Sequence, residues 1–339
     1  MLNDTNIELV KQKLFSGNKL KIVITTHHKP DGDALGSSLG LYHYLIQLNH
    51  QVQVISPTDY PYNLWWMPGN ETVWEFEKTD TQSRELIANA DLIFCLDFNH
   101  LDRINEMGEL VKASSAMKVM IDHHLNAEGF EDAAYADTRA VATAELIYKF
   151  IVYLGDEEKI NNASAQCLYA GILTDSGSFK FNSTTQSVHE IAGKLLSKGV
   201  KPFDVFEQIF DSNTENRLRF IGYCTNKKMI VLPEYNTAYI SVTREELKEY
   251  KITTGDTEGL VNYPLSIKGI KLAALIIDRT EKIKLSLRSK GDIAVNEICS
   301  KYFSGGGHKN ASGGHSTQTL EQTVQTFLSV LPTIKQQLV

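Results

Sequence analysis

Acidic and histidine residues directly follow four apolar runs, and this placement constrains the chain more than any other feature. His27, Asp31 and Asp33 come after KIVITT, Asp97 follows DLIFCL, the triplet Asp122, His123 and His124 follows MKVMI, and Asp175 follows YAGILT. Apolar runs of this kind are typical of buried strands or helices. The pattern predicts carboxylates and imidazoles at four element ends, which is what a dinuclear metal site requires.

Residues 1 to about 190 alternate apolar runs with amphipathic stretches. The runs are KIVITT, VQVIS, DLIFCLDF and MKVMID, and helices are expected over 37–48, 143–154, 159–175 and 184–199. This alternation predicts an α/β domain with a parallel sheet flanked by helices. Ligands of such sheets bind outside the carboxyl ends of the strands, where the His and Asp residues fall.

From about residue 215 the pattern changes to four strand-like runs and a helical stretch. The runs are KKMIVL, TAYISVT, IKLAALIID and KIKLSLRS, and the helical stretch covers 293–302. They predict a second, smaller mixed α/β domain. We expect the first domain at 1–200, a linker at 201–216 and the second domain at 217–339.

Composition limits the partners of the chain. The 339 residues carry a net charge of −7, which argues against coating long duplex DNA, so a nucleic-acid substrate should be short. The first residues lack a leader pattern and no apolar stretch approaches about 18 residues, so we expect no membrane partner and a cytoplasmic location. The four cysteines stand far apart, and we expect them to be packing residues rather than disulfide or zinc ligands.

The segment HHKPDGD places two carboxylates on a tight turn. Gly32 between Asp31 and Asp33 lets the turn aim them at different sides of one cavity, and the small residues that follow open a helix whose N-terminal N–H groups favour an anion. The alternative is that both are only turn and N-cap residues. His27 and His28 weigh against it, because two histidines at the end of an apolar strand have no structural role.

The remaining three clusters also allow structural interpretations. Asp97 could be a strand-end cap, His123 and His124 could be satisfied core histidines, and Asp175 could be a turn residue. A carboxylate that ends a buried strand is costly unless it is hydrogen-bonded or bound to metal. Because all of these alternatives would have to hold together, the metal site is favoured.

The ligand types indicate a reaction. Two divalent ions about 3.5 to 4 Å apart can activate a water and stabilise both the attacking and the leaving oxygen of a displacement at phosphorus. Hydrolysis of a phosphate ester is therefore the expected chemistry. The sequence contains no GxSxG nucleophile motif.

The motifs HHKPDGD, LDFN, DHH and TDSG, in this order, resemble those of the DHH phosphoesterase family. DTEGLVN, LSLRS and SGGGHKNASGG resemble the C-terminal domain associated with that family, so the resemblance covers nearly the whole chain. The likeness within the family is to the nanoRNase and pAp phosphatase (NrnA-like) branch. It implies an enzyme that trims very short oligoribonucleotides to mononucleotides and removes the 3′-phosphate from 3′-phosphoadenosine 5′-phosphate (pAp). It also permits a homodimer.

The resemblance implies roles for individual residues. It implies two divalent ions, usually manganese, one held by His27, Asp31 and Asp97 and the other by Asp33, Asp97, His123 and Asp175, with Asp97 as the bridge. An oxygen-rich set with two imidazoles suits manganese better than a soft, thiolate-seeking ion. His124 would face the scissile phosphate, with Asp97 and Asp122 as the other catalytic residues.

The second domain is expected to bind substrate through Arg288, Gly305, Gly306, Gly307, His308 and Lys309. The glycine run allows close backbone approach and a nest of N–H groups for a phosphate, and the arginine can clamp a phosphate with two hydrogen bonds. A flexible loop and a solvated strand-end arginine are the alternatives. With metals on one domain and this loop on the other, we expect the substrate in a cleft between them.

Substrate preference stays open at this stage. Val141 and Ala142 stand where the family often has two serines, and Trp65 and Trp66 could stack a base, although a packing role is favoured. The alternative functions are hydrolysis of linear dinucleotides such as pApA, cleavage of pyrophosphate or polyphosphate, and nucleotide-dependent regulation without catalysis.

Overall fold

The computed structural model describes residues 2–279 and 282–339, and the chain divides into two compact units. The first ends at Ser212 and the second begins at Asn213. Residues 201–216, expected as a linker, are largely helical: α8 spans Pro202–Phe206, a π-helical turn spans Glu207–Asp211, and α9 (Glu215–Tyr223) follows. The domain limits expected from the sequence stay a prediction.

The first unit is built on a seven-stranded sheet whose order is β1-β7-β6-β5-β2-β3-β4. Strands β2 to β7 are parallel, and only β1 at the edge runs antiparallel to its neighbour. The predicted parallel sheet is therefore confirmed. The strands are β1 Leu2–Asn3, β2 Lys21–Thr26, β3 Gln51–Ser56, β4 Trp74–Glu75, β5 Leu92–Leu96, β6 Met117–Asp122 and β7 Ala133–Asp137.

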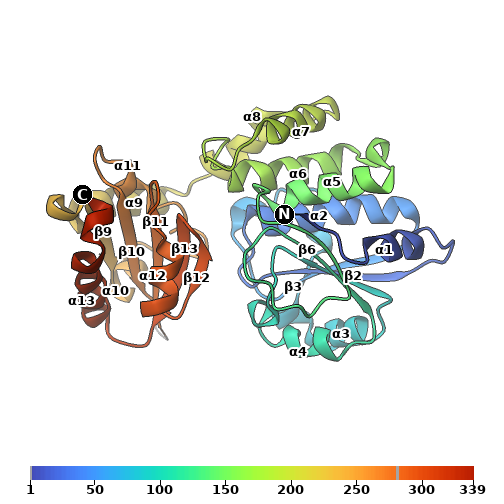
Figure 1. The fold of residues 1–339 in the computed structure, drawn as a ribbon, viewed down its shortest axis with the longest axis horizontal. Coiled ribbons are helices and arrows are strands. Elements are labelled where there is room, and N and C mark those ends of the chain that lie inside the picture. Colours follow the sequence, from blue (N-terminus) through green and yellow to red (C-terminus); the bar gives the residue numbers. More distant parts are fainter. Residues whose placement is uncertain (1, 280–281) are drawn as a thin grey trace. The chain divides into compact units, whose positions relative to one another are not determined.

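Helices cover both faces of this sheet (Figure 1). Side chains of β2 alternate between two cores: Ile22 and Ile24 belong to one, and Val23 belongs to the other. Burial on both faces explains the apolar runs IVI of β2 and LIFCL of β5. The helices are α1 Ile7–Leu14, α2 Gly32–Leu45, α3 Phe76–Ala88, α4 Met107–Ala113, α5 Thr143–Leu154, α6 Asn162–Asp175 and α7 Gln186–Ser197.

The strand order reverses direction between β2 and β5. After β2 the chain adds β3 and β4 on one side, then returns through α3 to place β5 on the other side of β2. Such a switch point opens a crevice at the carboxyl ends of the two strands, and this is where α/β proteins bind ligands. His27 and Asp97 directly follow β2 and β5.

Helices α2 and α6 approach closely through a row of glycines. A Cβ on Gly36 would lie 2.5 Å from the carbonyl oxygen of Cys167, and one on Gly40 would lie 2.5 Å from the Leu168 side chain. On the opposing helix, a Cβ on Gly171 would lie 2.9 Å from a carboxylate oxygen of Asp33. The spacing of four residues along α2 keeps these contacts on one face of the helix. This close packing brings the start of α2 to the end of α6.

The second unit contains a six-stranded mixed sheet with the order β12-β13-β11-β10-β9-β8. Strands β9 and β10 are parallel, whereas the other neighbours are antiparallel, which confirms the predicted mixed α/β domain. The strands are β8 Met229–Leu232, β9 Thr237–Val242, β10 Leu272–Asp278, β11 Ile283–Ser289, β12 Gly306–His308 and β13 Ala311–Ser316. Besides α9, the helices are α10 Arg244–Glu249, α11 Asn262–Ser266, α12 Val295–Tyr302, α13 Leu320–Val330 and α14 Lys335–Leu338.

The glycine-rich segment, expected to bind phosphate, forms a β-hairpin, and its phosphate binding stays a prediction. Gly306 and His308 lie on β12, which pairs with β13. A Cβ on Gly305 would lie 2.1 Å from the carbonyl oxygen of Gly313, so this position requires glycine for the hairpin alone. The alternative of a flexible loop does not hold for this segment, because Gly306 and His308 lie on a paired strand and Gly305 packs against the backbone of Gly313.

Other sequence-based expectations have separate outcomes. The four cysteines are buried and free. Of the expected core or interdomain packing role, Trp66 shows the first, because it packs against the core of the first unit. Trp65 is 60% exposed, so a core position is wrong for it, and packing between the domains stays a prediction. In the described part of the chain, no helix combines the length and the apolar character needed to cross a membrane.

The glycine contact yields a stability prediction. Gly36→Ala should lower the free energy of unfolding by about 1–3 kcal/mol, because the new methyl group meets backbone that cannot move aside easily. Urea unfolding followed by circular dichroism measures this change. Gly193→Ala in α7 is the control, since its Cβ would enter open space; it should be neutral or stabilise by up to about 1 kcal/mol. Equal effects at both positions would contradict the close packing of α2 and α6.

Candidate metal centre

His27 is fixed by hydrogen bonding at the end of β2. The residue is 7% exposed, and its Nδ1 lies 2.9 Å from the carbonyl oxygen of His28. Because a carbonyl only accepts, Nδ1 carries the proton and Nε2 of the neutral ring presents a lone pair. Nε2 lies 3.4 Å from Oδ2 of Asp97 and 4.0 Å from Oδ2 of Asp31.

Asp31 has both of the roles considered for it. Its Oδ1 accepts hydrogen bonds from the backbone N–H groups of Asp33 and Ala34, each at 3.1 Å, which caps the N-terminus of α2. Its Oδ2 is the oxygen that faces His27. The cap therefore positions a carboxylate that also belongs to the cluster.

Asp97 lies at the centre of the cluster and is 2% exposed. Its Oδ2 faces Nε2 of His27, and its Oδ1 faces Nε2 of His123, both at 3.4 Å. The hydroxyl of Thr143 donates a hydrogen bond of 2.9 Å to Oδ1. The backbone of Asp97 has a φ of 64°, a left-handed conformation that is uncommon outside glycine and concentrates at functional sites. One carboxylate thus joins two imidazoles that come from different strand ends.

A second group surrounds His123 after β6. Its Nε2 lies 3.5 Å from Oδ2 of Asp175 and 3.8 Å from Oδ2 of Asp33, while Nδ1 lies 3.2 Å from the carbonyl oxygen of Ala140. As in His27, the carbonyl fixes the ring so that Nε2 faces carboxylates. Asp175 is the last residue of α6, where the helix dipole disfavours a negative charge, so this carboxylate needs a nearby cation.

The N-terminus of α5 holds Asp33 in place. The backbone N–H groups of Thr143 and Ala144 donate hydrogen bonds of 2.6 and 2.8 Å to its two oxygens. Helix N-termini favour negative charge, so α5 stabilises this buried carboxylate. The sequence analysis missed this role of Thr143, and the threonine directly before an apolar helical run was the available signal.

His124 and Asp122 form a separate pair. Nδ1 of His124 donates a hydrogen bond of 2.7 Å to Asp122, whose other oxygen accepts the backbone N–H of His124 at 3.0 Å. Nδ1 also lies 3.7 Å from Asp97. Asp122 is 1% exposed, so it holds the imidazole firmly beside the central carboxylate.

Burial and opposite charges together shift the pKa values of the cluster. Burial opposes protonation of His27 and His123, but hydrogen bonds to Asp97 and nearby carboxylate charges outweigh it and raise both pKa values. Burial alone would raise the pKa of Asp97, but bonds from these two imidazoles lower it well below its usual range. Burial and the charge of Asp31 raise the pKa of Asp175 to about 8. The cluster therefore attracts positive charge, either as protons or as metal ions.

The donor atoms fit metal ions. His27, Asp31 and Asp97 present ligand atoms within 4.8 Å of one another, and so do Asp33, His123 and Asp175. Carboxylate oxygens with neutral imidazole nitrogens suit divalent ions such as manganese, and the carbonyls behind both rings are the usual outer partners of metal-binding histidines. The structure brings together all six residues that the sequence analysis assigned as metal ligands.

The second unit carries the residues expected to bind substrate. Arg288 of β11 and His308 of β12 both pair with Ala311 of β13, so the two side chains lie on one face of the sheet with an alanine between them. The ammonium of Lys309 lies 2.7 Å from Asp292 in an exposed ion pair, which holds it only weakly. Gly306 adds no side chain beside this row, and a Cβ there would enter open space.

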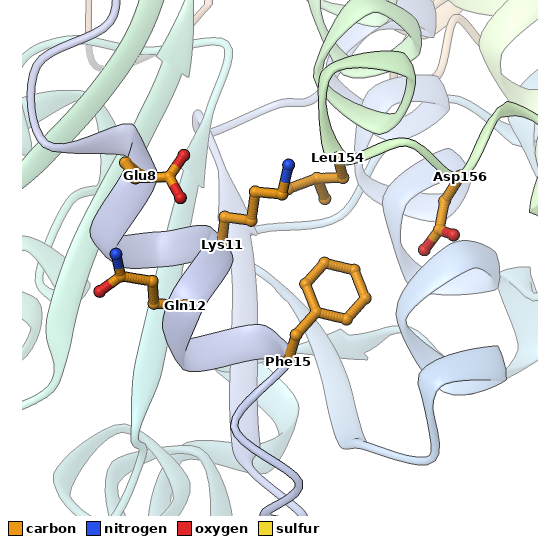
Figure 2. A pocket seen from close by; sticks show the side chains of 6 residues that line it. All are labelled: Glu8, Lys11, Gln12, Phe15, Leu154 and Asp156. Carbon is orange, nitrogen blue, oxygen red and sulfur yellow. The ribbon is translucent and has the colours of Figure 1, made fainter.

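A cavity of about 390 Å³ lies apart from these clusters (Figure 2). Lys11 and Phe15, from α1 and its end, line it together with Leu154 and Asp156 at the end of α5. The other end of α5, at Thr143, is the end that contacts the metal-ligand cluster, and a helix of 12 residues separates the two ends by about 18 Å. The cavity is therefore not the place where the imidazoles gather.

Two family models match the chain. Residues 21–172 match the DHH family, N-terminal domain, and residues 235–336 match the DHHA1 domain. A protein of Thermus thermophilus named bifunctional oligoribonuclease and PAP phosphatase NrnA is 30% identical over 292 residues, which cover 86% of this chain and 83% of that relative. The chain belongs to the DHH family.

Further comparisons support this membership. The Bacillus subtilis protein of the same name is 28% identical over 296 residues, which cover 86% of this chain and 88% of that protein. The crystal structure of an exopolyphosphatase-related protein from Bacteroides fragilis has a TM-score of 0.93 and 40% identity, and the match covers 98% of this chain and 97% of that one. The three residues Asp122, His123 and His124 form the Asp-His-His sequence after which the family is named, and they have different roles. His123 faces the carboxylates of the second group, whereas Asp122 accepts a hydrogen bond from His124.

The raised pKa values predict how metal binding depends on pH. His27, His123 and Asp175 must each lose a proton to act as ligands, so Mn²⁺ should bind more tightly as the pH rises from about 6 to about 8. Titration calorimetry in buffers of different ionisation enthalpy measures both the affinity and the protons released. Asp175→Asn should remove the part of the release that titrates near pH 8. An affinity independent of pH would show that the cluster holds no displaceable protons.

The hydroxyl of Thr143 gives a second prediction. Thr143→Val should weaken Mn²⁺ binding roughly ten- to hundredfold, the range found when a partner behind a metal ligand is lost, because Oδ1 of Asp97 loses its donor. Thr225→Val is the matched control, since that hydroxyl donates to backbone carbonyls of the preceding helix, α9, in the second unit. Equilibrium dialysis against Mn²⁺ compares them, and equal losses would assign the effect to general destabilisation.

Proposed function

We propose that this chain is a metal-dependent phosphoesterase that hydrolyses short oligoribonucleotides to mononucleotides and pAp to AMP. Relatives that match 83–88% of their own length carry the name bifunctional oligoribonuclease and PAP phosphatase. The observation that carries the proposal is the position of Asp97, whose two oxygens face the imidazoles of two separate ligand groups. A shared carboxylate is what a pair of adjacent ions requires.

We assign the cluster to two divalent ions, with manganese as the proposed metal. His27, Asp31 and Asp97 would hold one ion, and Asp33, Asp97, His123 and Asp175 would hold the other. Bound there, such ions would activate water and offset negative charge at phosphorus. The chain's own contribution is to hold the ligands rigidly through α5, Thr143 and the carbonyls behind the imidazoles.

His124 is the proposed proton-transfer and phosphate-facing residue. Asp122 accepts the Nδ1 proton, which orients the ring. When Nε2 carries a proton, it donates a hydrogen bond to a phosphate oxygen or that proton to the leaving oxygen. Asp122 is catalytic only in the sense that it positions this ring.

The second unit provides a proposed phosphate-binding face. Arg288 and His308 extend from neighbouring strands on one face, and the small Ala311 between them leaves room for a ligand to lie close to the sheet. The guanidinium can bind two phosphate oxygens, and Lys309 adds charge at the end of β12. Gly305 and Gly307 serve the hairpin, and Gly306 allows a ligand to approach the edge strand.

One observation favours a second candidate. The Bacteroides fragilis protein, 40% identical over nearly the whole chain, is described as exopolyphosphatase-related. Cleavage of a phosphoanhydride uses the same displacement at phosphorus, so the metal ligands do not distinguish the two functions. The row of Arg288 and His308 also binds either kind of phosphate. Only a comparison of substrates separates the candidates.

Initial rates with Mn²⁺ on a matched panel test the proposal. The panel contains pAp, RNA dinucleotides to pentanucleotides, pApA, pyrophosphate and polyphosphate. We expect activity on pAp and the short RNAs, and Asp97→Asn should lower it by at least about 1000-fold, because both ligand groups lose charge. Lys78→Gln, at an exposed ion pair, should retain full activity. Turnover of pyrophosphate or polyphosphate alone would overturn the proposal in favour of the anhydride hydrolase.

A further inference from the structure

We infer that Arg103 binds a phosphate group of the substrate on the His27 side of the metal cluster. This inference rests on the proposed function, since it names a binding residue for the same site. Arg103 lies on a short 3₁₀ helix, Leu101–Ile104, that begins four residues after Asp97. It was not among the residues singled out from the sequence, because a lone arginine outside a motif gives no signal there.

The backbone fixes Arg103 beside the metal ligands. Its carbonyl oxygen accepts two hydrogen bonds from His28, one from the backbone N–H at 2.8 Å and one from Nδ1 at 2.9 Å. His28 directly follows the ligand His27, so the 3₁₀ helix and the end of β2 are joined as one unit. The second of the tandem histidines therefore has a structural role, because it anchors the segment that carries Arg103.

Arg103 differs from the other arginines in its bonding. Hydrogen bonds to neighbouring residues hold the guanidinium groups of Arg84, Arg139, Arg217, Arg219, Arg244, Arg279 and Arg288. Arg103 is partly buried, yet among the residues that the structure describes its guanidinium makes no hydrogen bond or ion pair. With no such bond to hold it, this guanidinium is available to an anionic ligand.

Electrostatics place the guanidinium near the metal ligands. After burial and the hydrogen bond to Asp97, the charges of Asp31 and Arg103 are the next influences on the pKa of His27, and the charge of Arg103 opposes protonation. The charge of Arg103 therefore lies near enough to His27 to oppose its protonation.

The negative charge of the site explains why a cation is useful there. A phosphate that enters the cluster approaches five carboxylates, those of Asp31, Asp33, Asp97, Asp122 and Asp175. Metal ions offset part of this negative charge, and a guanidinium offsets more while its planar fork matches two phosphate oxygens. Arginine cannot serve as a metal ligand here, because it stays protonated. Recognition of the substrate phosphate is the role that remains.

Phosphate binding to the Mn²⁺-loaded full chain tests the inference. We expect Arg103→Ala to weaken binding of inorganic phosphate, measured by titration calorimetry, roughly 10- to 100-fold, the range for a hydrogen bond to a charged group. Arg103→Lys should restore part of the affinity, because it keeps the charge and loses the fork. Mn²⁺ affinity should stay unchanged in both variants, since the carbonyl contact to His28 belongs to the backbone. Arg84→Ala, which removes an arginine that is partly buried but paired with Asp80, should behave like the unmodified chain.

Two results would overturn the inference. Unchanged phosphate affinity in Arg103→Ala would show that the guanidinium does not bind phosphate. A parallel loss of Mn²⁺ affinity would show that Arg103 acts through His27, as a positioning residue. The outcome is distinguishable from failure of the proposed function, because phosphate binding is measured without turnover. A chain that fails to hydrolyse pAp and short RNA but loses phosphate affinity with Arg103→Ala would keep the inference and lose the function.

Discussion

Mutual repulsion among buried carboxylates is the constraint on which the first domain depends. Asp33, Asp97 and Asp175 come from distant parts of the chain, and each is held within reach of an imidazole; Asp33 and Asp97 are buried, and Asp175 is partly buried. Such an arrangement is costly unless donors and cations surround it. In this domain the stabilising groups are the N-terminus of α5, the hydroxyl of Thr143 and two imidazoles that backbone carbonyls hold in one orientation.

The sequence predicted most of the architecture because most elements have a clear local pattern. Four of the parallel strands, β2, β3, β5 and β6, fall on the apolar-rich runs expected as strands, and α5 occupies the expected residues 143–154. Strand β7, with the sequence AAYAD, was missed because alanine has little preference for a strand and the register with β6 defines it. The hairpin of β12 and β13 was missed for a related reason, since glycine-rich strands carry no periodic side-chain pattern.

The candidate site was predictable to a different degree for different kinds of group. Side chains with metal-binding chemistry stand out in the sequence, and the structure brings the six assigned ligands together. The groups that hold them do not stand out: backbone N–H donors at α5, the carbonyls behind His27 and His123, and a single hydroxyl. Their role arises only from the way distant segments meet, which no local pattern records. Arg103 is of the same kind, because its unusual feature is that its guanidinium has no partner among the described residues, which only three-dimensional proximity could reveal.

The glycine row of α2 also affects the order in which the protein can assemble. Gly32, Gly36 and Gly40 together disfavour an isolated helix by roughly 3 kcal/mol relative to alanine, so this segment gains its helical form only when α6 is present to pack against it. Asp31 and Asp33 lie at the start of that segment. The nascent chain therefore completes both ligand groups only after α6 has been synthesised, well over a hundred residues after α2. Until then it has no complete metal-binding site.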